Sequence, residues 1–222
     1  MSRNGDFCHQ SFLTIERENL IMEHLLKVEY TLHIITREDV GVDEPRIEIA
    51  FLRIINNRAD VALRDSGMLA TVFPNSFGIT SGASEIRNKF LQVSYDPQRD
   101  GNYIGIVVRA IEEDHSSETT RSANRDSFTS AIQNAAQQAL DAGHTPTVDE
   151  IWSAGHATQL LDTDFVDDDD RIGVSARVYP AAGEIISKND GSFSEDLELR
   201  FTEEGGHYLL TGKLIAIPNP LI

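Results

Sequence analysis

The sequence predicts a mostly β fold, an antiparallel β-sandwich with an inserted α-helical segment, and three observations support this. Apolar and polar residues alternate in many short segments, as in strands that bury one face. Gly and Pro punctuate these segments at short intervals. One stretch, within residues 115–166, instead repeats its apolar residues at helical spacing. The 222 residues, 40% of them hydrophobic, suffice for one domain with a sizeable core.

Alternation predicts strands along most of the chain. In residues 46–55, for example, Ile47, Ile49 and Phe51 share one side. The clearest predicted strands are 27–36, 46–55, 103–111, 172–179, 197–201 and 207–217, and weaker ones are 61–63, 68–73 and 85–95. So many short strands favour two packed sheets, because each strand buries only one face.

Helical spacing predicts a helix over residues 127–142, with Gly143 as its stop. A second helix should begin at Thr147, where Glu150 completes a capping box, and end before Gly155. Residues 14–26 form a third candidate helix. We therefore expect an extension over residues 1–26 and one sandwich domain over 27–217. The domain would carry a helical insertion at about 115–166, and residues 218–222 would form a tail.

The charge balance restricts the classes of partner. The chain has 36 Asp plus Glu against 19 Lys plus Arg, a formal net charge of −17, which repels nucleic acid and bare anionic lipid. Such acidity fits cation binding, and salt adaptation would look the same. No signal core and no run of about 18 apolar residues occurs, so the default expectation is a soluble, cytoplasmic protein, with leaderless export left open. A single cysteine, Cys8, precludes an intramolecular disulfide.

Acidic residues gather in three loops beside predicted strands. Residues 162–170 hold six carboxylates in nine positions, and such a run is most often a solvated surface loop. Hard oxygen ligands at this density also suit Ca²⁺, which takes six to eight of them. The other two acidic clusters flank the strands 27–36, 46–55 and 103–111; their members are Glu38, Asp39, Asp43 and Glu44, then Glu112, Glu113 and Asp114. Three such loops at one end of a sandwich would form a cup.

This arrangement resembles a C2 domain. The resemblance rests on an acidic loop ending in Asp43-Glu44-Pro45, a following strand, and a later acid-x-acid pair with Asp170-Arg-Ile-Gly173. The paired acids could be Asp162 and Asp164, which reproduce the spacing of the family's third loop. They could equally be Glu112 and Asp114, with the third loop enlarged by about fifty residues to hold the helices. We prefer the second register, because residues 103–111 make a far better strand than those before Asp162.

The resemblance covers about 120 of the 222 residues and implies a calcium-binding module whose ordered loops recognise a partner. In the preferred register the implied Ca²⁺ ligands are Asp39, Asp43, Glu44, Glu112, Asp114, Asp168 and Asp170. The implied partners are a phospholipid surface reached through a calcium bridge, a protein or a glycan. Arg46, where the family usually has an aromatic residue, departs from its pattern. So does a set of only four lysines, which argues against docking through a Lys-rich sheet face.

Two other classes compete with the calcium module. A structural or assembly sandwich would carry the same acids as a solvated surface. A metal-dependent hydrolase could use His115, His144 or His156 as a general base beside the acidic cup. However, the sequence has no His-Glu-x-x-His, Gly-x-Ser-x-Gly or Walker-type motif, so a binding module is favoured over an enzyme.

Overall fold

The computed structural model describes residues 24–36, 45–67, 69, 84–96, 100, 102–112, 117–161, 170–188, 192–203 and 206–218. Along these residues strands predominate, and the helices follow β5 and β6. The elements are β1 (His24–Thr36), β2 (Pro45–Ile55), β3 (Arg58–Asp65), β4 (Ser84–Tyr95), β5 (Ile104–Glu112), α1 (Glu118–Asp141), α2 (Val148–His156), β6 (Asp170–Tyr179), α3 (Ala182–Lys188), β7 (Phe193–Phe201) and β8 (His207–Pro218).

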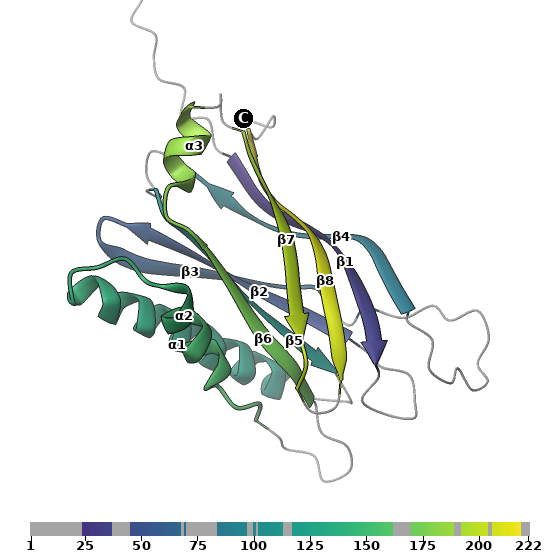
Figure 1. Ribbon diagram of the computed structural model, residues 1–222. Helices are drawn as coiled ribbons and strands as arrows, with labels where there is room; N and C mark the ends of the chain where they lie inside the picture. The colour runs from purple at the N-terminus through teal and green to yellow at the C-terminus, as the bar shows by residue number, and fades with distance from the viewer. Residues whose placement is uncertain are drawn as a thin grey trace, which may run out of the picture.

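The strands form two antiparallel four-stranded sheets (Figure 1). Sheet A has the order β4-β1-β8-β7 and sheet B the order β3-β2-β5-β6. The hairpin between β2 and β3 turns at Asn56 and Asn57, both with positive φ, as a two-residue turn between twisted strands requires. The predicted mostly β, sandwich-type fold with inserted helices is confirmed.

The main core lies between the two sheets. Alternate residues of β1 and β2, such as Val28, Leu32, Ile47 and Phe51, point inward and are fully buried. They meet inward residues of β5, β7 and β8, so the core is built by the alternation seen in the sequence. Only one face of sheet A is used in this way; sheet B buries both of its faces.

The outer face of sheet B is covered by α1 and α2, which gives the molecule a third layer (Figure 1). A second hydrophobic cluster fills this interface, with Leu52 and Val107 from the sheet and Phe128 and Ile132 from α1. The side of Gly155 facing this cluster has no spare space, because a Cβ there would lie 3.0 Å from Phe128 and Val107. This close approach explains why α2 continues through Gly155 to His156 instead of ending before it.

The helix boundaries agree with the sequence in part. The capping box between Thr147 and Glu150 is present, as predicted. The first helix begins at Glu118, nine residues before the predicted start, with Ser117 as its N-cap. Its first turns are polar on the outside and bury Asn124 on the inside, so their apolar pattern is too weak to mark a helix.

Two further differences concern the ends of elements. Residues 24–26 belong to β1 and not to a helix, because they pair with both β4 and β8, and the rest of the predicted 14–26 helix lies outside the described residues. The short helix α3 was not predicted, and its apolar residues Ala182 and Ile186 complete the main core. The weak strand predicted at 68–73 lies outside the described residues except for Leu69.

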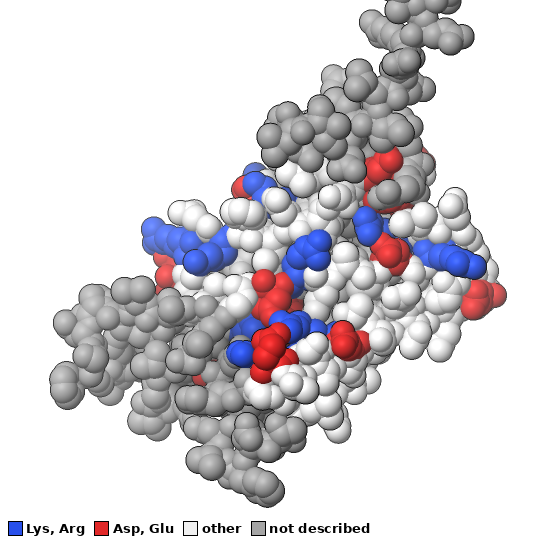
Figure 2. Space-filling model, turned by 180° about the vertical axis from the view of Figure 1, so that it is seen from behind, with Lys and Arg blue, Asp and Glu red and all other residues white. Residues whose placement is uncertain are grey.

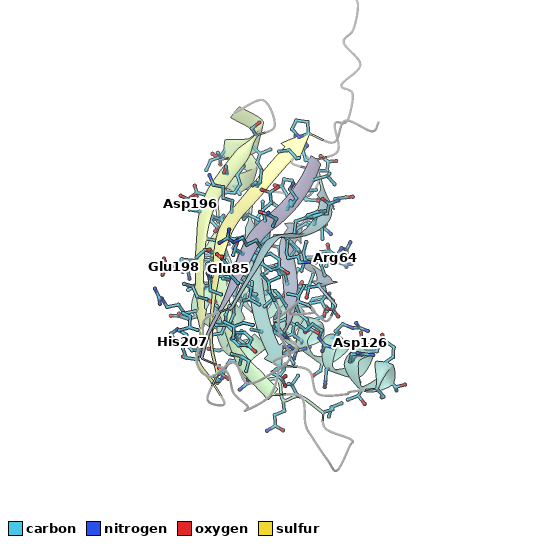
Figure 3. All side chains as sticks on the ribbon, turned by 90° about the vertical axis from the view of Figure 1, so that its right-hand side faces the viewer. Arg64, Glu85, Asp126, Asp196, Glu198 and His207 are labelled. Carbon is cyan, nitrogen blue, oxygen red and sulfur yellow. The ribbon has the colours of Figure 1, made fainter. Side chains whose placement is uncertain are left out.

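Arginines of sheet B reach the margins of sheet A. Arg53 and Arg64 donate to the carbonyl oxygens of Ser94 and Gln92 on β4, each at 2.9 Å. On the opposite margin Arg177 donates to the carbonyl oxygen of Glu198 on β7, at 3.0 Å. Figure 3 looks onto sheet A and shows Glu198 and Arg64 on opposite sides of it. These bonds tie the two sheets together at both margins.

Candidate functional site

The ends of three neighbouring strands of sheet B define the candidate site. Pro45 at the start of β2 pairs with Glu112 at the end of β5, and Glu112 pairs with Asp170 at the start of β6. Neighbouring strands lie about 4.8 Å apart, so these three backbone positions span about 10 Å. Sheet B is therefore connected at three neighbouring positions to segments 37–44, 113–116 and 162–169, which carry most residues of the three acidic clusters.

The structure describes only two of the seven predicted ligands. Asp39, Asp43, Glu44, Asp114 and Asp168 lie outside the described residues. Of the other two, Asp170 is the first residue of β6 and only its backbone is described, whereas the Glu112 side chain is 3% exposed. A carboxylate as buried as that of Glu112 needs a compensating cation or hydrogen-bond donors. Among the described residues no three His, Cys, Asp or Glu side chains lie close enough together to hold a metal ion.

Other acids at this end of the sandwich pair with arginines of the insertion and of β6. Asp65, at the end of β3, accepts from Arg125 of α1 at 2.9 Å, and Arg125 also reaches Glu118 at 2.6 Å. Glu203, after β7, accepts from Arg171 at 2.8 Å. Figure 2 shows a similar mixture on the face turned away in Figure 1, where Lys and Arg lie in small groups beside Asp and Glu. Acids in this part of the chain can thus be balanced without a metal.

A fully buried ionic cluster lies beneath the candidate site, between sheet B and α1. Glu48 of β2 accepts from Arg109 of β5 at 2.6 and 2.9 Å, and Arg46 lies 3.3 Å from the other carboxylate oxygen. The Arg109 guanidinium also lies 4.3 Å from the ring centre of Phe128, a favourable cation–π position. These three charged side chains are at most 1% exposed and carry a formal charge of +1.

Burial has a direct electrostatic effect on this cluster. It lowers the pKa of Arg109, Glu48 opposes that change, and the nearby guanidinium groups of Arg46 and Arg171 add to the lowering. Guanidinium is nevertheless the cation best suited to such a place, because it stays charged and is weakly hydrated. The cluster therefore remains ionic, and Glu48 is the carboxylate that compensates the charge of Arg109.

The cluster is connected to the segment that leads into the acidic run. Arg109 donates to the backbone carbonyl oxygen of Asn124, at 3.2 Å, and the Asn124 side chain accepts from the backbone N–H of Leu161, at 2.6 Å. Arg171 donates to the carbonyl oxygens of His156 and Thr158. Residues 156–161, which precede the acidic run in the sequence, are thus fixed to sheet B by buried and partly buried hydrogen bonds.

Sequence reasoning missed this cluster, although a signal was present. Glu48 and Arg109 are charged residues inside largely apolar strands, and each lies on the face opposite the main-core residues. Two isolated charges of opposite sign in adjacent strands indicate a buried pair. The sequence could not place them in register, since register depends on the pairing of β2 with β5.

The histidines proposed for a hydrolase do not converge. His144 lies before α2 and is 3.7 Å from Glu150, whereas His156 ends α2, stacks on Trp152 and is 3.4 Å from Glu203. His144 precedes α2 and His156 is its last residue, and the nine residues of α2 alone are about 13 Å long. His115 lies outside the described residues. His144 and His156 therefore lie at opposite ends of α2 and have different acidic partners, Glu150 and Glu203.

The fold and the site define this chain as a three-layered, antiparallel β-sandwich protein with an acidic loop end. Comparison with protein-family models, with curated proteins and with solved structures finds no match. The described residues contain no helix long and apolar enough to cross a membrane.

Proposed function

We propose that this chain is a calcium-binding β-sandwich module whose acidic loops are ordered by Ca²⁺ into a recognition surface. The observation that carries the proposal is the pairing of Pro45, Glu112 and Asp170, from which the three acidic segments depart. Seven carboxylates within reach of one such rim are enough for one or two Ca²⁺ ions, each of which takes six to eight oxygens. Uncompensated, the same carboxylates would repel one another.

The partner of the ordered rim would be a phospholipid surface reached through a calcium bridge, a protein or a glycan. A net charge of −17 disfavours direct contact with anionic lipid, so a membrane would have to be met through bound cations. Nucleic acid is disfavoured for the same reason.

Thermal unfolding followed by Trp152 fluorescence tests the proposal, with the protein first in EDTA and then in rising Ca²⁺. Trp152 is a suitable reporter because its indole N–H donates to Val174 of β6, so its environment changes when the insertion leaves the sheet. Ca²⁺ at 100 times its dissociation constant stabilises the folded state by about 2.7 kcal/mol, a rise of roughly 5 to 10 °C in Tm. Mg²⁺ at matched ionic strength should give a much smaller rise.

Substitutions of single acidic residues and pairs of them test where the ion binds. Asp114→Asn together with Asp170→Asn should abolish the rise, because both acids belong to the proposed ligand set. Asp126→Asn, which removes an exposed acid on α1, is the matched control and should respond like the parent protein. A double variant that still responds to Ca²⁺ would refute the ligand assignment. Equal responses to Ca²⁺ and Mg²⁺ would refute a specific calcium site.

A structural or assembly sandwich is the second candidate, and the pairing of Asp65 and Glu203 with arginines favours it. In that case acids and arginines would balance within the fold. Thermal unfolding would then be indifferent to Ca²⁺, and sedimentation would show an oligomer that grows with protein concentration.

A further inference from the structure

The outer face of sheet A, which none of the described helices covers, is hollowed by a groove of about 360 Å³. This volume is at the lower end of the roughly 300 to 1,000 Å³ of small-ligand sites. The groove crosses the middle of β4, β1 and β8 and is far in sequence from the acidic loops. Its lining residues are Glu29, Tyr30, Thr31, Asn88, Lys89, Phe90, Thr211, Gly212 and Lys213.

Two backbone features create the hollow. Gly212 of β8 offers no side chain, and a Cβ there would lie 1.9 Å from the carbonyl oxygen of Glu29, so no other residue fits. Opposite it, β4 contains a bulge: Tyr30 pairs with Lys89 but Leu32 pairs with Ile86, which leaves one extra residue on β4. Asn88 in this bulge has φ of 56°, a conformation that Asn tolerates better than most residues. Bulges often redirect side chains at binding sites.

The groove gathers most of the lysines of the chain. Three of the four lysines in the sequence, Lys27, Lys89 and Lys213, lie in or beside it. Lys27 pairs with Glu29 at 2.5 Å, and Lys213 lies 3.6 Å from Asp196. The side chain of Lys89 makes no ion pair or hydrogen bond within the part of the chain that the structure describes. The three lysines and the acids Glu29 and Asp196 thus leave the rim with a formal charge of +1 on a strongly anionic protein.

The remaining lining groups narrow the chemical class of ligand that the groove could bind. Phe90 is 57% exposed, the most exposed large apolar side chain among the described residues, and one side of its ring is covered by Lys27 at 5.3 Å. Hydroxyls of Thr31 and Thr211 and the carboxylate of Glu29 add acceptors next to the ammonium groups. The Glu29 carboxylate accepts hydrogen bonds from hydroxyl groups, and it repels a polyphosphate more strongly than a ligand group with a single negative charge.

We propose that this groove binds an acidic sugar, such as a hexuronate residue of an oligosaccharide. The sugar carboxylate would meet the ammonium groups of Lys89 and Lys213, its hydroxyls would bond to the threonines and Glu29, and its C–H face would lie on Phe90. In each of these contacts, one group of the sugar meets a side chain that lines the groove. The site is independent of the proposed calcium centre and does not require it.

Isothermal titration calorimetry with trigalacturonate tests this inference, in low salt and with EDTA present. EDTA separates the groove from any calcium bridge, so failure here and failure of the calcium proposal are distinguishable. The fully methyl-esterified trisaccharide is the matched neutral probe and should bind at least about tenfold more weakly, because it lacks the charge. Inositol hexakisphosphate is the probe for a general polyanion site.

Variants assign the binding to the groove. Lys89→Gln and Lys213→Gln should each weaken binding about tenfold, and Phe90→Ala should weaken it by a similar factor. Lys188→Gln removes the same charge at the end of α3, outside the groove lining, and should leave the affinity within about twofold. Lys89, Phe90 and Lys213 are exposed, and equal Tm values would show that all the variants are folded.

Three results would overturn the inference. One is the absence of any heat of binding with trigalacturonate at millimolar concentration. Another is equal weakening by Lys188→Gln and Lys89→Gln, which would indicate attraction to overall charge. The last is tighter binding of inositol hexakisphosphate than of the uronide, which would assign the groove to phosphate groups.

Discussion

The two interfaces of sheet B differ in chemistry, although they share the same strands. Toward sheet A the contact is almost wholly apolar and is built from alternate residues of every strand. Toward the helices, apolar residues surround the buried Arg46, Glu48, Arg109 and Asn124. An apolar contact stabilises without regard to direction, whereas a buried ionic contact requires particular partners at particular distances. The first interface therefore supplies most of the stability, and the second fixes where the helices and the acidic run attach.

The largest expected effect comes from removing the only carboxylate of the ionic cluster. Glu48→Leu leaves Arg109 buried without its counter-ion and should lower the free energy of unfolding by about 3 to 5 kcal/mol, measured by urea denaturation. Glu48→Leu made together with Arg109→Met removes both charges and should recover at least about 1 kcal/mol of that loss. A double variant as unstable as the single one would show that the pair is not coupled as described.

A truncation in the apolar interface should have a slightly smaller effect. Leu210 is fully buried in the main core, and Leu210→Ala should lower the free energy of unfolding by about 3 kcal/mol through lost burial and the resulting cavity. Leu209→Ala, on the other face of the same strand, is the control and should cost less than half as much. Similar losses at both positions would contradict the assignment of the inner face of β8.

The polar link to the acidic run can be tested separately. Asn124→Ala leaves the backbone N–H of Leu161 without its buried acceptor and should cost about 2 kcal/mol. Amide hydrogen exchange at Leu161 should speed up by more than exchange in the core strands. Asn134→Ala, at an exposed position of the same helix, is the control. Uniformly faster exchange throughout the protein would point to global destabilisation and not to loss of this link.

The smallest of these effects concerns the start of α2. Thr147→Ala removes the side chain that accepts from the backbone N–H of Glu150, and it should cost about 1 kcal/mol. Thr145→Ala, two residues earlier and outside the capping box, should leave the unfolding midpoint unchanged. If both variants behave alike, the capping box contributes nothing measurable to stability.

The contrast between the interfaces also explains what the sequence could predict. Alternating residues such as Ile47, Ile49 and Phe51 encode strand and inner face locally, so the mostly β sandwich was predictable. The capping box at Thr147 is equally local. The beginning of α1 was not predictable, because Thr120 and Asn124 are buried polar residues whose environment depends on the distant strand β5. Pairing across the chain, not local pattern, decides such positions.

The functional features of the molecule also include some that the sequence could predict and others that it could not. Acid clusters beside Pro45, Glu112 and Asp170 could be read directly from the sequence, whereas their adjacency depends on the order β2-β5-β6. The Lys-containing groove depends on a bulge in β4 and on Gly212, and neither has a sequence pattern that brings β1, β4 and β8 together. The ligand assignment at the acidic end therefore stays a prediction, and the groove on the outer face of sheet A was not predicted.

The arginines along the margins of sheet A bear on how the protein behaves at high concentration. An unpaired strand edge is a template on which another chain can add a strand, which is the first step of fibril growth. Arg53 and Arg64 already occupy carbonyl groups of β4, and Arg177 occupies one of β7, so those acceptors are not open to a neighbouring molecule. Arg64 and Arg177 also place positive charge at the two margins, whereas Arg53 is neutralised by Asp60 and Asp100. Such a sandwich discourages edge-to-edge pairing with its own copies, and loss of these arginines would turn the two margins of sheet A into aggregation sites.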